Sequence, residues 1–303
     1  MEARNRKIVW SASPTPFLSD GSLDPAGIDN LIEQHQKLGV DGLFLGGTCG
    51  EGPFTPTSQR LEMIRMVKKS AGDCFTLCSQ VSDTSAARVK DNIQSVADLG
   101  IDFVVIARPI VERFYDKIEM VRRYFFEAIE SSPLPVAIYM IGKPDEEVLG
   151  LDLWIEIASH PNVKFVKDST ASNEFRTALC KLKKKRPELT VLTGNEFDVI
   201  GAVKAGYDGG LLGTGILNAG MIRRAVDAVA NGKTKDAQEW QDRSNAFLWD
   251  LFEKNISLWL GGLKYALKKL GIFNDEFMHL HFPLTDAQCR RIDEALERER
   301  EFI

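Results

Sequence analysis

The sequence predicts a (β/α)8 barrel, or TIM barrel, followed by a C-terminal helical appendage. Strand-like and helix-like segments alternate at a spacing of about 25–35 residues, as in successive βα units. Eight such units end near residue 230, and beyond it the pattern is helical only. We therefore predict a barrel over residues 1–230 and a helical extension packed on it over residues 231–303. A doubly wound open sheet is the alternative, but no GxGxxG motif follows the first predicted strand.

The predicted strands are short, rich in β-branched or aromatic residues, and mostly apolar on both faces. Buried parallel strands have this composition because both of their faces are covered. In chain order they are Ile8–Ala12, Gly42–Gly46, Phe75–Gln80, Phe103–Ala107, Val136–Tyr139, Val163–Lys167, Thr190–Thr193 and Gly209–Leu212. In a barrel of this class, the functional side chains project from the C-terminal ends of these strands.

Helix starts agree with this division of the chain. Asp24-Pro25 and Thr55-Pro56 each offer an N-cap followed by a first-turn proline. In the appendage, helices are predicted over Lys233–Asn255 and Leu258–Leu270. A last helix is predicted to begin at Thr285–Gln288, which fits the capping-box pattern.

Composition limits the partners and the compartment. A net charge of −5 argues against a nucleic-acid or anionic-membrane surface. The basic run Lys181–Arg186 lies at a predicted helix end, where cations suit the helix dipole. No apolar stretch approaches the roughly 18 residues that cross a bilayer, and no signal-peptide core follows the N-terminus. Five scattered cysteines without a CxxC pair indicate a reducing cytoplasm.

Lys167 is the most informative residue. It closes the apolar run Val163–Lys167 and enters a polar turn, Asp168-Ser169-Thr170. Desolvation disfavours the ammonium form of an enclosed lysine, and the free amine can attack a carbonyl to form a Schiff base. Asp168 is expected to face away, because adjacent strand residues point to opposite faces. A solvated lysine at a strand end is the alternative interpretation.

Other candidate residues follow other predicted strands. Backbone N–H groups of Gly47 and Cys49, with the Thr48 hydroxyl, can bind a small carboxylate; no Lys or Arg accompanies this loop to favour a phosphate. Tyr139 is a candidate proton carrier, or alternatively a buried core tyrosine. Glu196 can hydrogen-bond a polyol chain or simply start the next helix. Ser169, Gly213 and Thr214 are further candidate substrate contacts.

No metal site or cofactor is predicted. None of the four histidines (His35, His160, His279 and His281) lies at a strand's C-terminal end. His279 and His281 share one face of an extended segment, but two ligands do not make a site.

Four segments stand in family-like order: Gly47-Thr48-Cys49-Gly50-Glu51, Tyr139, Val166-Lys167-Asp168, and residues 206–211. They resemble, respectively, the GTTGE or GSTGE signature, the strand-five tyrosine, the IK[ED] segment and the GADGGI segment of one family. This is the N-acetylneuraminate lyase / dihydrodipicolinate synthase family of class I Schiff-base aldolases. The likeness covers nearly the whole chain, including the helical tail.

The resemblance implies that Lys167 condenses with the keto carbon of pyruvate or a related 2-keto acid. The Thr48-Cys49 loop would bind the carboxylate, and Tyr139 would shuttle protons. Lys167, Tyr139 and Thr48 are thus the predicted catalytic residues. The protonated imine is then an electron sink for making or breaking a bond at the adjacent carbon. Family members are usually homotetramers, often dimers of dimers, so a tetramer or dimer is expected.

Departures from the family pattern bear on the substrate. Pro144 stands where synthases have the arginine of YNVPxR, and residues 107–111 replace the TPYY segment. Tyr115 or Arg108 is a candidate substitute for the missing tyrosine, and Cys49 replaces the second threonine of the signature. These changes favour an aldolase or dehydratase acting on a 2-keto-3-deoxy sugar acid over a dihydrodipicolinate synthase-type condensation.

Two further alternatives remain open. One is a phosphate-binding barrel enzyme that uses the glycine-rich turn Gly209–Gly215 as its anion site. The other is a relative with reduced catalysis, which binds a keto acid at Lys167 without turnover.

Overall fold

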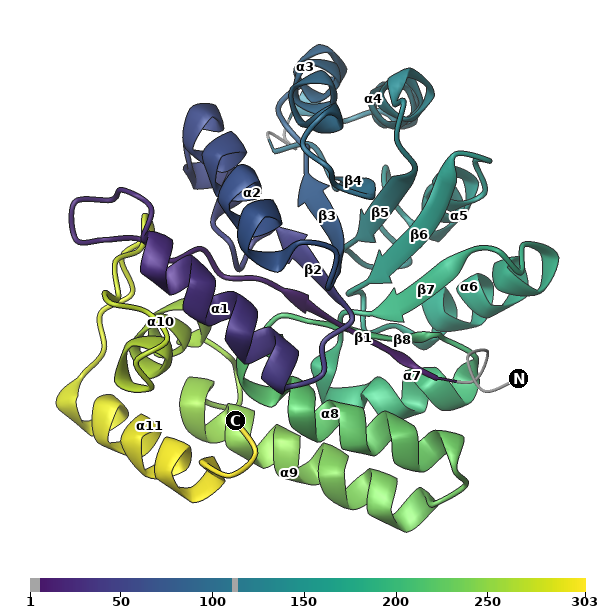
Figure 1. Cartoon of the computed structure of the whole chain (residues 1–303). Helices are drawn as coiled ribbons and strands as arrows, with labels where there is room; N and C mark the ends of the chain where they lie inside the picture. Colours follow the sequence, from purple (N-terminus) through teal and green to yellow (C-terminus); the bar gives the residue numbers. More distant parts are fainter. Residues whose placement is uncertain (1–5, 111–113) are drawn as a thin grey trace. The chain divides into compact units, whose positions relative to one another are not determined.

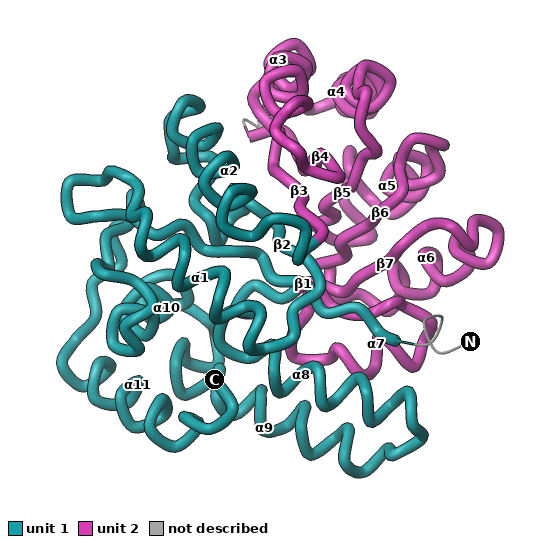
Figure 2. The backbone as a smooth tube through the Cα atoms, in the orientation of Figure 1, with its two compact units in different colours: residues 1–75, 212–303 teal, residues 76–211 magenta. Residues whose placement is uncertain are grey.

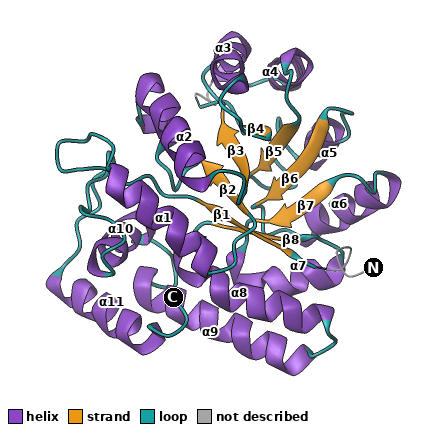
Figure 3. Ribbon diagram, in the orientation of Figure 1, coloured by secondary structure: helices purple, strands orange, loops and turns teal. Residues whose placement is uncertain are grey.

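We describe the fold from a computed structural model, which covers residues 6–110 and 114–303. Eight strands close a barrel in sequence order, β1 to β8, and helices alternate with them (Figures 1 and 3). Three further helices, α9 to α11, follow α8. The predicted barrel with C-terminal helices is thus confirmed. By its internal contacts the chain forms two compact units, described in turn below (Figure 2).

Unit 1 consists of residues 1–75 and 212–303. Its elements are β1 (Ile8–Ala12), α1 (Pro25–Lys37), β2 (Gly42–Leu45), the 3-10 helix η2 (Gly52–Phe54), α2 (Thr57–Ala71), α8 (Gly215–Ala230), α9 (Thr234–Phe252), α10 (Trp259–Lys269) and α11 (Asp286–Glu299). Helix α8 packs on both α9 and β1. The predicted boundary at residue 230 falls in the turn between α8 and α9, and the division itself stays a prediction.

Unit 2 consists of residues 76–211. Its elements are β3 (Thr76–Gln80), α3 (Ala86–Ala97), β4 (Phe103–Ile106), α4 (Ile118–Ser131), β5 (Val136–Met140), α5 (Leu151–Ala158), β6 (Val163–Asp168), α6 (Asn173–Lys185), β7 (Thr190–Thr193), η4 (Glu196–Asp198), α7 (Val199–Ala205) and β8 (Gly209–Leu212). Neighbouring strands β3 to β8 pair in parallel. Every predicted strand is present, with ends within one residue of the prediction.

The predicted helix starts have mixed outcomes. The capping box of α11 is confirmed, since Thr285 and Gln288 each accept from the other's backbone N–H. Asp24 is the N-cap of α1, but its carboxylate accepts from the Asn274 amide at 3.0 and 3.1 Å instead of capping. The Thr55-Pro56 prediction is wrong. Helix α2 begins at Thr57, and the Thr55 hydroxyl donates to the Glu51 carbonyl at 2.9 Å.

A Gly-x-Asp turn recurs before β2, β4 and β8. Its aspartates are Asp41, Asp102 and Asp208, and each glycine has a positive φ, between 69° and 123°. Each carboxylate accepts the N–H of a residue in the preceding strand at 2.8 Å. The aspartate N–H donates back to the carbonyl of that same residue at 2.8–2.9 Å. The two bonds fix each strand pair at its N-terminal end, opposite the strand ends predicted to carry the site.

Within the described residues, no helix has both the length and the apolar character needed to cross a membrane.

Candidate active site

Lys167 lies in β6, and its side chain is only 5% exposed. Its register partner on β5 is Tyr139, and the Lys167 Nζ atom lies 4.1 Å from the centre of the Tyr139 ring. Tyr139 itself is half-buried. The two residues of unit 2 that are predicted to be catalytic are therefore in contact, with the Lys167 amine over the ring of Tyr139. The solvated-lysine alternative does not fit this degree of burial.

Asp168 faces away from Lys167, as the strand alternation predicts. Its carboxylate is 4% exposed and accepts from the Tyr207 hydroxyl at 2.6 Å. The second carboxylate oxygen accepts from the Thr170 hydroxyl at 2.7 Å and from the Thr170 N–H at 3.0 Å. Burial and the neighbouring Asp168 charge raise the pKa of Tyr207, which therefore stays a protonated donor. The turn after Lys167 is thus held by a satisfied, buried carboxylate.

Ser169 lies on the same side as Lys167, against Gly194. A side chain added at Gly194 would meet Ser169 Oγ at 1.9 Å and Lys167 Cε at 3.0 Å, so it would have to displace one of these two side chains. Strands on both sides fix this turn, because Ser169 N–H donates to Met140 and Gly194 N–H to Asp168. The predicted contact residue Ser169 is therefore beside the amine.

Glu196 is half-buried and begins the short helix η4, which Asn195 caps by accepting the Phe197 N–H at 3.2 Å. Glu196 thus starts a helix, which is one of the two interpretations that its sequence context allowed. Its contact with a polyol stays a prediction.

The loop after β2 belongs to unit 1. Gly46 has φ +63°, and a side chain on Gly52 would come within 1.8 Å of the Gly46 carbonyl, so the loop folds back tightly on itself. At its tip Thr48 is exposed and Cys49 is half-buried. Gly47 packs against the Phe44 ring, where an added side chain would meet ring carbons at 2.7 Å. The loop therefore presents the Thr48 hydroxyl at the C-terminal end of its strand.

Glu51, the last residue of the same motif, is fully buried and pairs with Lys264 of α10, with 2.9 Å between Oε1 and Nζ. No local pattern in the sequence gives Glu51 a role of its own or connects it with Lys264. A signal was present: Lys264 lies four residues after Leu260 and three before Leu267, on the apolar face of its helix. A charge on such a face requires a buried partner.

Gly213 and Thr214 follow β8. Gly213 is half-buried, whereas Thr214 is 5% exposed and its hydroxyl donates to Asn218 Oδ1 at 3.3 Å. Asn218 in turn donates to Ser244 of α9 at 3.1 Å. The Thr214 hydroxyl is thus part of a buried network, and its role as a substrate contact stays a prediction.

His35 is buried in unit 1. Its Nδ1 donates to the Leu31 carbonyl at 2.8 Å, so Nε2 accepts from the Ser11 hydroxyl at 2.9 Å. Burial lowers the pKa of His35 to about 4, and the ring is neutral. Among the described residues, no group of three or more His, Cys, Asp or Glu side chains is arranged to hold a metal ion.

Arg108 and Tyr115, the candidate substitutes for the missing tyrosine, both make polar contacts within unit 2. Arg108 pairs with Glu146 at 2.9 Å and approaches the Ile141 carbonyl at 3.5 Å, just past β5. The Tyr115 hydroxyl donates to the Thr84 carbonyl at 2.9 Å. Val111, the last residue of the same departing segment, lies outside the described residues. Arg108 and Tyr115 line a cavity of about 430 Å³ in unit 2.

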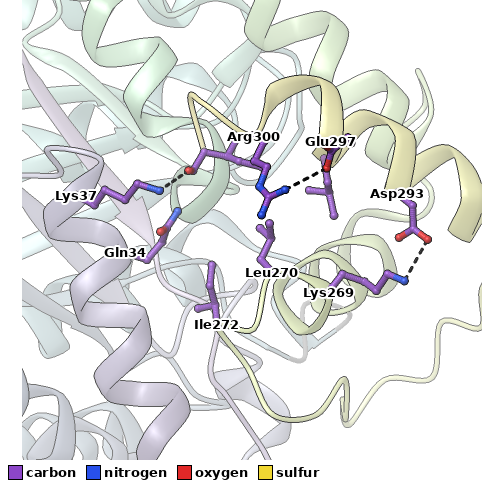
Figure 4. Close-up of a pocket in the computed structure, with 10 residues that line it drawn as sticks. Gln34, Lys37, Lys269, Leu270, Ile272, Asp293, Glu297 and Arg300 are labelled. Atoms are coloured by element: carbon purple, nitrogen blue, oxygen red, sulfur yellow. Dashed lines mark hydrogen bonds and ion pairs between the residues drawn. The ribbon is translucent and has the colours of Figure 1, made fainter.

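A second cavity, of about 570 Å³, lies in unit 1 among α1, α10 and the end of α11 (Figure 4). Its cations are already paired: Lys37 donates to the Ile303 carbonyl at 2.7 Å, and Lys269 lies 3.2 Å from Asp293. Arg300 lies 3.6 Å from Glu297. The three cations that line this cavity therefore already have partners in the structure.

The sequence model of the dihydrodipicolinate synthetase family matches residues 5–298 of this chain. The chain belongs to the dihydrodipicolinate synthetase family. This confirms the resemblance drawn from four motifs, and membership makes the protein a lyase of the class I, Schiff-base type.

Similar proteins carry the names of two activities of this family. N-acetylneuraminate lyase of Pasteurella multocida is 27% identical over 268 residues, covering 88% of this chain and 87% of that protein. The lyase of the same name from Lactiplantibacillus plantarum is 24% identical over 269 residues, covering 88% and 89%. Dihydrodipicolinate synthase of Thermotoga maritima shares the fold, with a TM-score of 0.86, 19% identity, and coverage of 97% and 98%. A prophage protein of the family from E. coli K12, solved in complex with pyruvate, has a TM-score of 0.82, 20% identity, and coverage of 97% and 98%.

Proposed function

We propose that this protein cleaves or dehydrates a 2-keto-3-deoxy sugar acid, or a related 2-keto acid, through a Schiff base at Lys167. The observation that supports this most directly is the placement of Lys167, buried at the end of β6 with its amine over the Tyr139 ring. A solved relative of the family binds pyruvate. The Thr48-Cys49 loop is proposed to hold the keto acid's carboxylate, because barrel loops after successive strands line one end.

The proposed chemistry begins when the Lys167 amine attacks the keto carbon and water leaves, giving a protonated imine. In the aldolase direction the C4 hydroxyl loses its proton and the C3–C4 bond breaks. C4 leaves as the carbonyl carbon of an aldehyde, and the electron pair of the broken bond moves into the imine, giving an enamine. Protonation at C3 and hydrolysis then release pyruvate and restore the amine. Tyr139, beside the amine, is the proposed proton carrier.

The substrate class is proposed from polar groups that follow β6 and β7 and from the relatives. Ser169 and Glu196 follow β6 and β7 and offer hydrogen bonds to hydroxyl groups. N-acetylneuraminate, the substrate named for the curated relatives, is itself a 2-keto-3-deoxy sugar acid. Pro144 supplies no cation at the position of the synthase arginine, so we place the dihydrodipicolinate-type condensation second.

The deciding experiment is borohydride trapping with pyruvate, followed by mass spectrometry of the modified peptide. A pyruvyl adduct on Lys167 is expected, and Lys167→Met should lose both the adduct and all turnover. Lys164→Met is the matched control, because Lys164 lies on the same strand but is half-exposed. An adduct on another lysine, or turnover in Lys167→Met, would sink the proposal. An adduct without turnover of any tested 2-keto acid would favour the non-catalytic relative.

We also propose that the protein assembles into a dimer or tetramer. Four large apolar side chains between β4 and the first turn of α4 are 40–60% exposed: Ile110, Phe114, Ile118 and Met120. Exposed apolar surface of this kind is typical of interaction sites, and the four residues lie close together in the sequence. Sedimentation should show an oligomer that Phe114→Glu weakens; a monomer at micromolar concentration contradicts this part of the proposal.

A further inference from the structure

Lys264, on α10, closes a ring of polar contacts behind the loop that carries Thr48. Its ammonium pairs with Glu51 at 2.9 Å and donates to the Thr15 carbonyl at 2.5 Å. The Thr15 hydroxyl donates in turn to the Gly50 carbonyl at 2.7 Å. Gly50 is the chain neighbour of Glu51, so the ring returns to its start. One amine therefore fixes the segments that follow both β1 and β2.

The backbone of Glu51 is itself unusual. It has φ +57°, a left-handed conformation that a residue with a side chain adopts only when its surroundings hold it there. The second carboxylate oxygen supplies part of that hold, because it accepts the His279 N–H at 2.7 Å. Both contacts to the carboxylate thus come from the C-terminal appendage, and both act on the residue that ends the loop.

The surroundings of the pair are apolar. The Lys264 and Glu51 side chains are 0% exposed. The Lys264 amine lies 4.8 Å from the centre of the Phe17 ring and 5.6 Å from that of Phe273. Burial lowers the pKa of Lys264, and the Glu51 charge opposes that shift. In such surroundings charge attraction is strong, but desolvation costs at least as much.

A buried ion pair is therefore a poor source of net stability compared with a well-packed apolar pair. It does impose one geometry, because each charge must stay against its partner. Here that geometry includes the loop tip, where Thr48 is exposed and Cys49 half-buried only two to three residues from Glu51. The position of the loop tip is thus set from the appendage.

We propose that Lys264 and Glu51 are positioning residues, through which the C-terminal appendage holds the Gly46–Gly52 loop in the conformation that binds the keto acid's carboxylate. The inference about carboxylate binding rests on the proposed function. The inference about the loop's conformation does not, and the two are measured separately.

The test uses the double variant Glu51→Met/Lys264→Met in the full chain, which removes both charges and keeps similar volumes. Lys268→Met is the matched control, because Lys268 lies on the same helix and pairs with Glu276 at 3.5 Å, with both side chains about half-exposed. Thr15→Val is a milder variant that removes only the hydroxyl bond to Gly50. Thermal unfolding establishes that each variant is folded.

Two readouts are taken on each protein. Hydrogen exchange of the loop amides, such as Gly52 N–H on the Gly47 carbonyl, is expected to accelerate about tenfold in the double variant and not in the control. The pyruvate concentration that half-saturates borohydride trapping is expected to rise about tenfold, while the trapping rate at saturating pyruvate changes less than about twofold. Thr15→Val should show a smaller change of the same sign in both.

Unchanged loop exchange in a folded double variant would overturn the conformational part. Accelerated exchange with unchanged half-saturation would overturn the link to carboxylate binding. An equal loss of trapping rate at all pyruvate concentrations would show general damage to the site and overturn the link as well. If the unaltered protein forms no imine, the proposed function fails, and hydrogen exchange alone still decides whether the appendage holds the loop. Should the double variant fail to fold, Thr15→Val decides by the same criteria.

Discussion

Asp168 in unit 2 and Glu51 in unit 1 are both buried carboxylates next to predicted site residues, yet different partners satisfy them. Asp168 accepts hydrogen bonds from neutral donors, and its most distant partner, Tyr207, lies 39 residues along the chain. Glu51 faces a full positive charge on α10 and a backbone N–H that lies 228 residues away. The end of β6, which carries Lys167, is therefore held by hydrogen bonds to residues of unit 2, at most 39 residues away in the sequence. The loop after β2 is held instead by Lys264 of α10 and by His279, which both belong to the C-terminal appendage.

This difference predicts how much stability is lost when a partner of each carboxylate is removed. Removing a neutral donor from Asp168 leaves a carboxylate with other hydrogen bonds. Removing Lys264 leaves a fully buried charge without its counter-ion, which is the costlier defect. Unit 1 should therefore be more sensitive to single substitutions than unit 2, and the following predictions test that order.

The largest effect is expected for Lys264→Met alone. It strands the Glu51 charge in an apolar site and should lower the free energy of unfolding by about 4 kcal/mol. Adding Glu51→Met should recover most of that loss, because the double variant holds no unpaired charge. Denaturant unfolding of the three proteins measures this. Equal stabilities of the single and double variants would contradict the charge-pairing argument.

The next effect is a pH dependence in unit 1. His35 has a pKa of about 4 in the folded protein and about 6.5 when unfolded. The unfolded chain therefore binds more protons between these values, so stability is complete above pH 6.5 and falls as pH drops toward 4. This group alone should remove about 3 kcal/mol over that window.

The check is to measure unfolding free energies at pH 7 and pH 4 for the unaltered protein and for His35→Gln. The variant should lose about 3 kcal/mol less on acidification, since glutamine does not titrate. His160→Gln serves as the control histidine. A variant that loses as much stability as the unaltered protein would show that His35 is not the group responsible.

A smaller effect is expected in unit 2 for Tyr207→Phe. Asp168 loses one charge-assisted hydrogen bond but keeps both from Thr170, so the expected loss is about 2 kcal/mol. Tyr115→Phe is the matched control, because its hydroxyl donates to a neutral carbonyl at a more exposed position. Denaturant midpoints should fall clearly for the first variant and little for the second. A larger fall for Tyr115→Phe than for Tyr207→Phe would show that the hydrogen bond to Asp168 does not stabilise unit 2 as proposed.

The smallest effect is expected for Lys269→Met, on the same helix as Lys264. Its partner Asp293 and the lysine itself are both more than a third exposed. Solvent screens such a pair, so no measurable shift of the unfolding midpoint is expected. A loss comparable to that of Lys264→Met would show that location on α10, not burial of the pair, explains the sensitivity.

Local patterns in the sequence were enough to predict the strands and the burial of Lys167 at the end of one of them. Each strand is a short apolar run, and Lys167 is conspicuous because a charge ends one of them. The orientation of Asp168 followed from alternation alone. Thr55-Pro56 was misread because a cap and a loop bond use the same hydroxyl, and only the fold of the preceding loop decides between them.

The role of Glu51 could not be predicted, since its partner lies in another part of the chain and no local pattern links them. Lys264 was detectable as a charge on an apolar helix face, but not the group it would pair with. Similarly, Thr214 follows a strand like the other candidate residues, yet its hydroxyl is taken up by Asn218. In both cases the partner of the side chain is decided by the folded structure, whether it lies four residues away, as Asn218 does, or in another part of the chain, as Lys264 does.

The three Gly-x-Asp turns have a consequence for how the chain reaches its fold. Each couples a strand to its immediate successor, so the contacts that it makes span only one helix of sequence. Contacts of low sequence separation form early, because closing a short loop costs less entropy than closing a long one. We expect the β1–β2, β3–β4 and β7–β8 pairs to be structured in the folding transition state. The Glu51–Lys264 contact should form only afterwards, on the downhill side of the barrier.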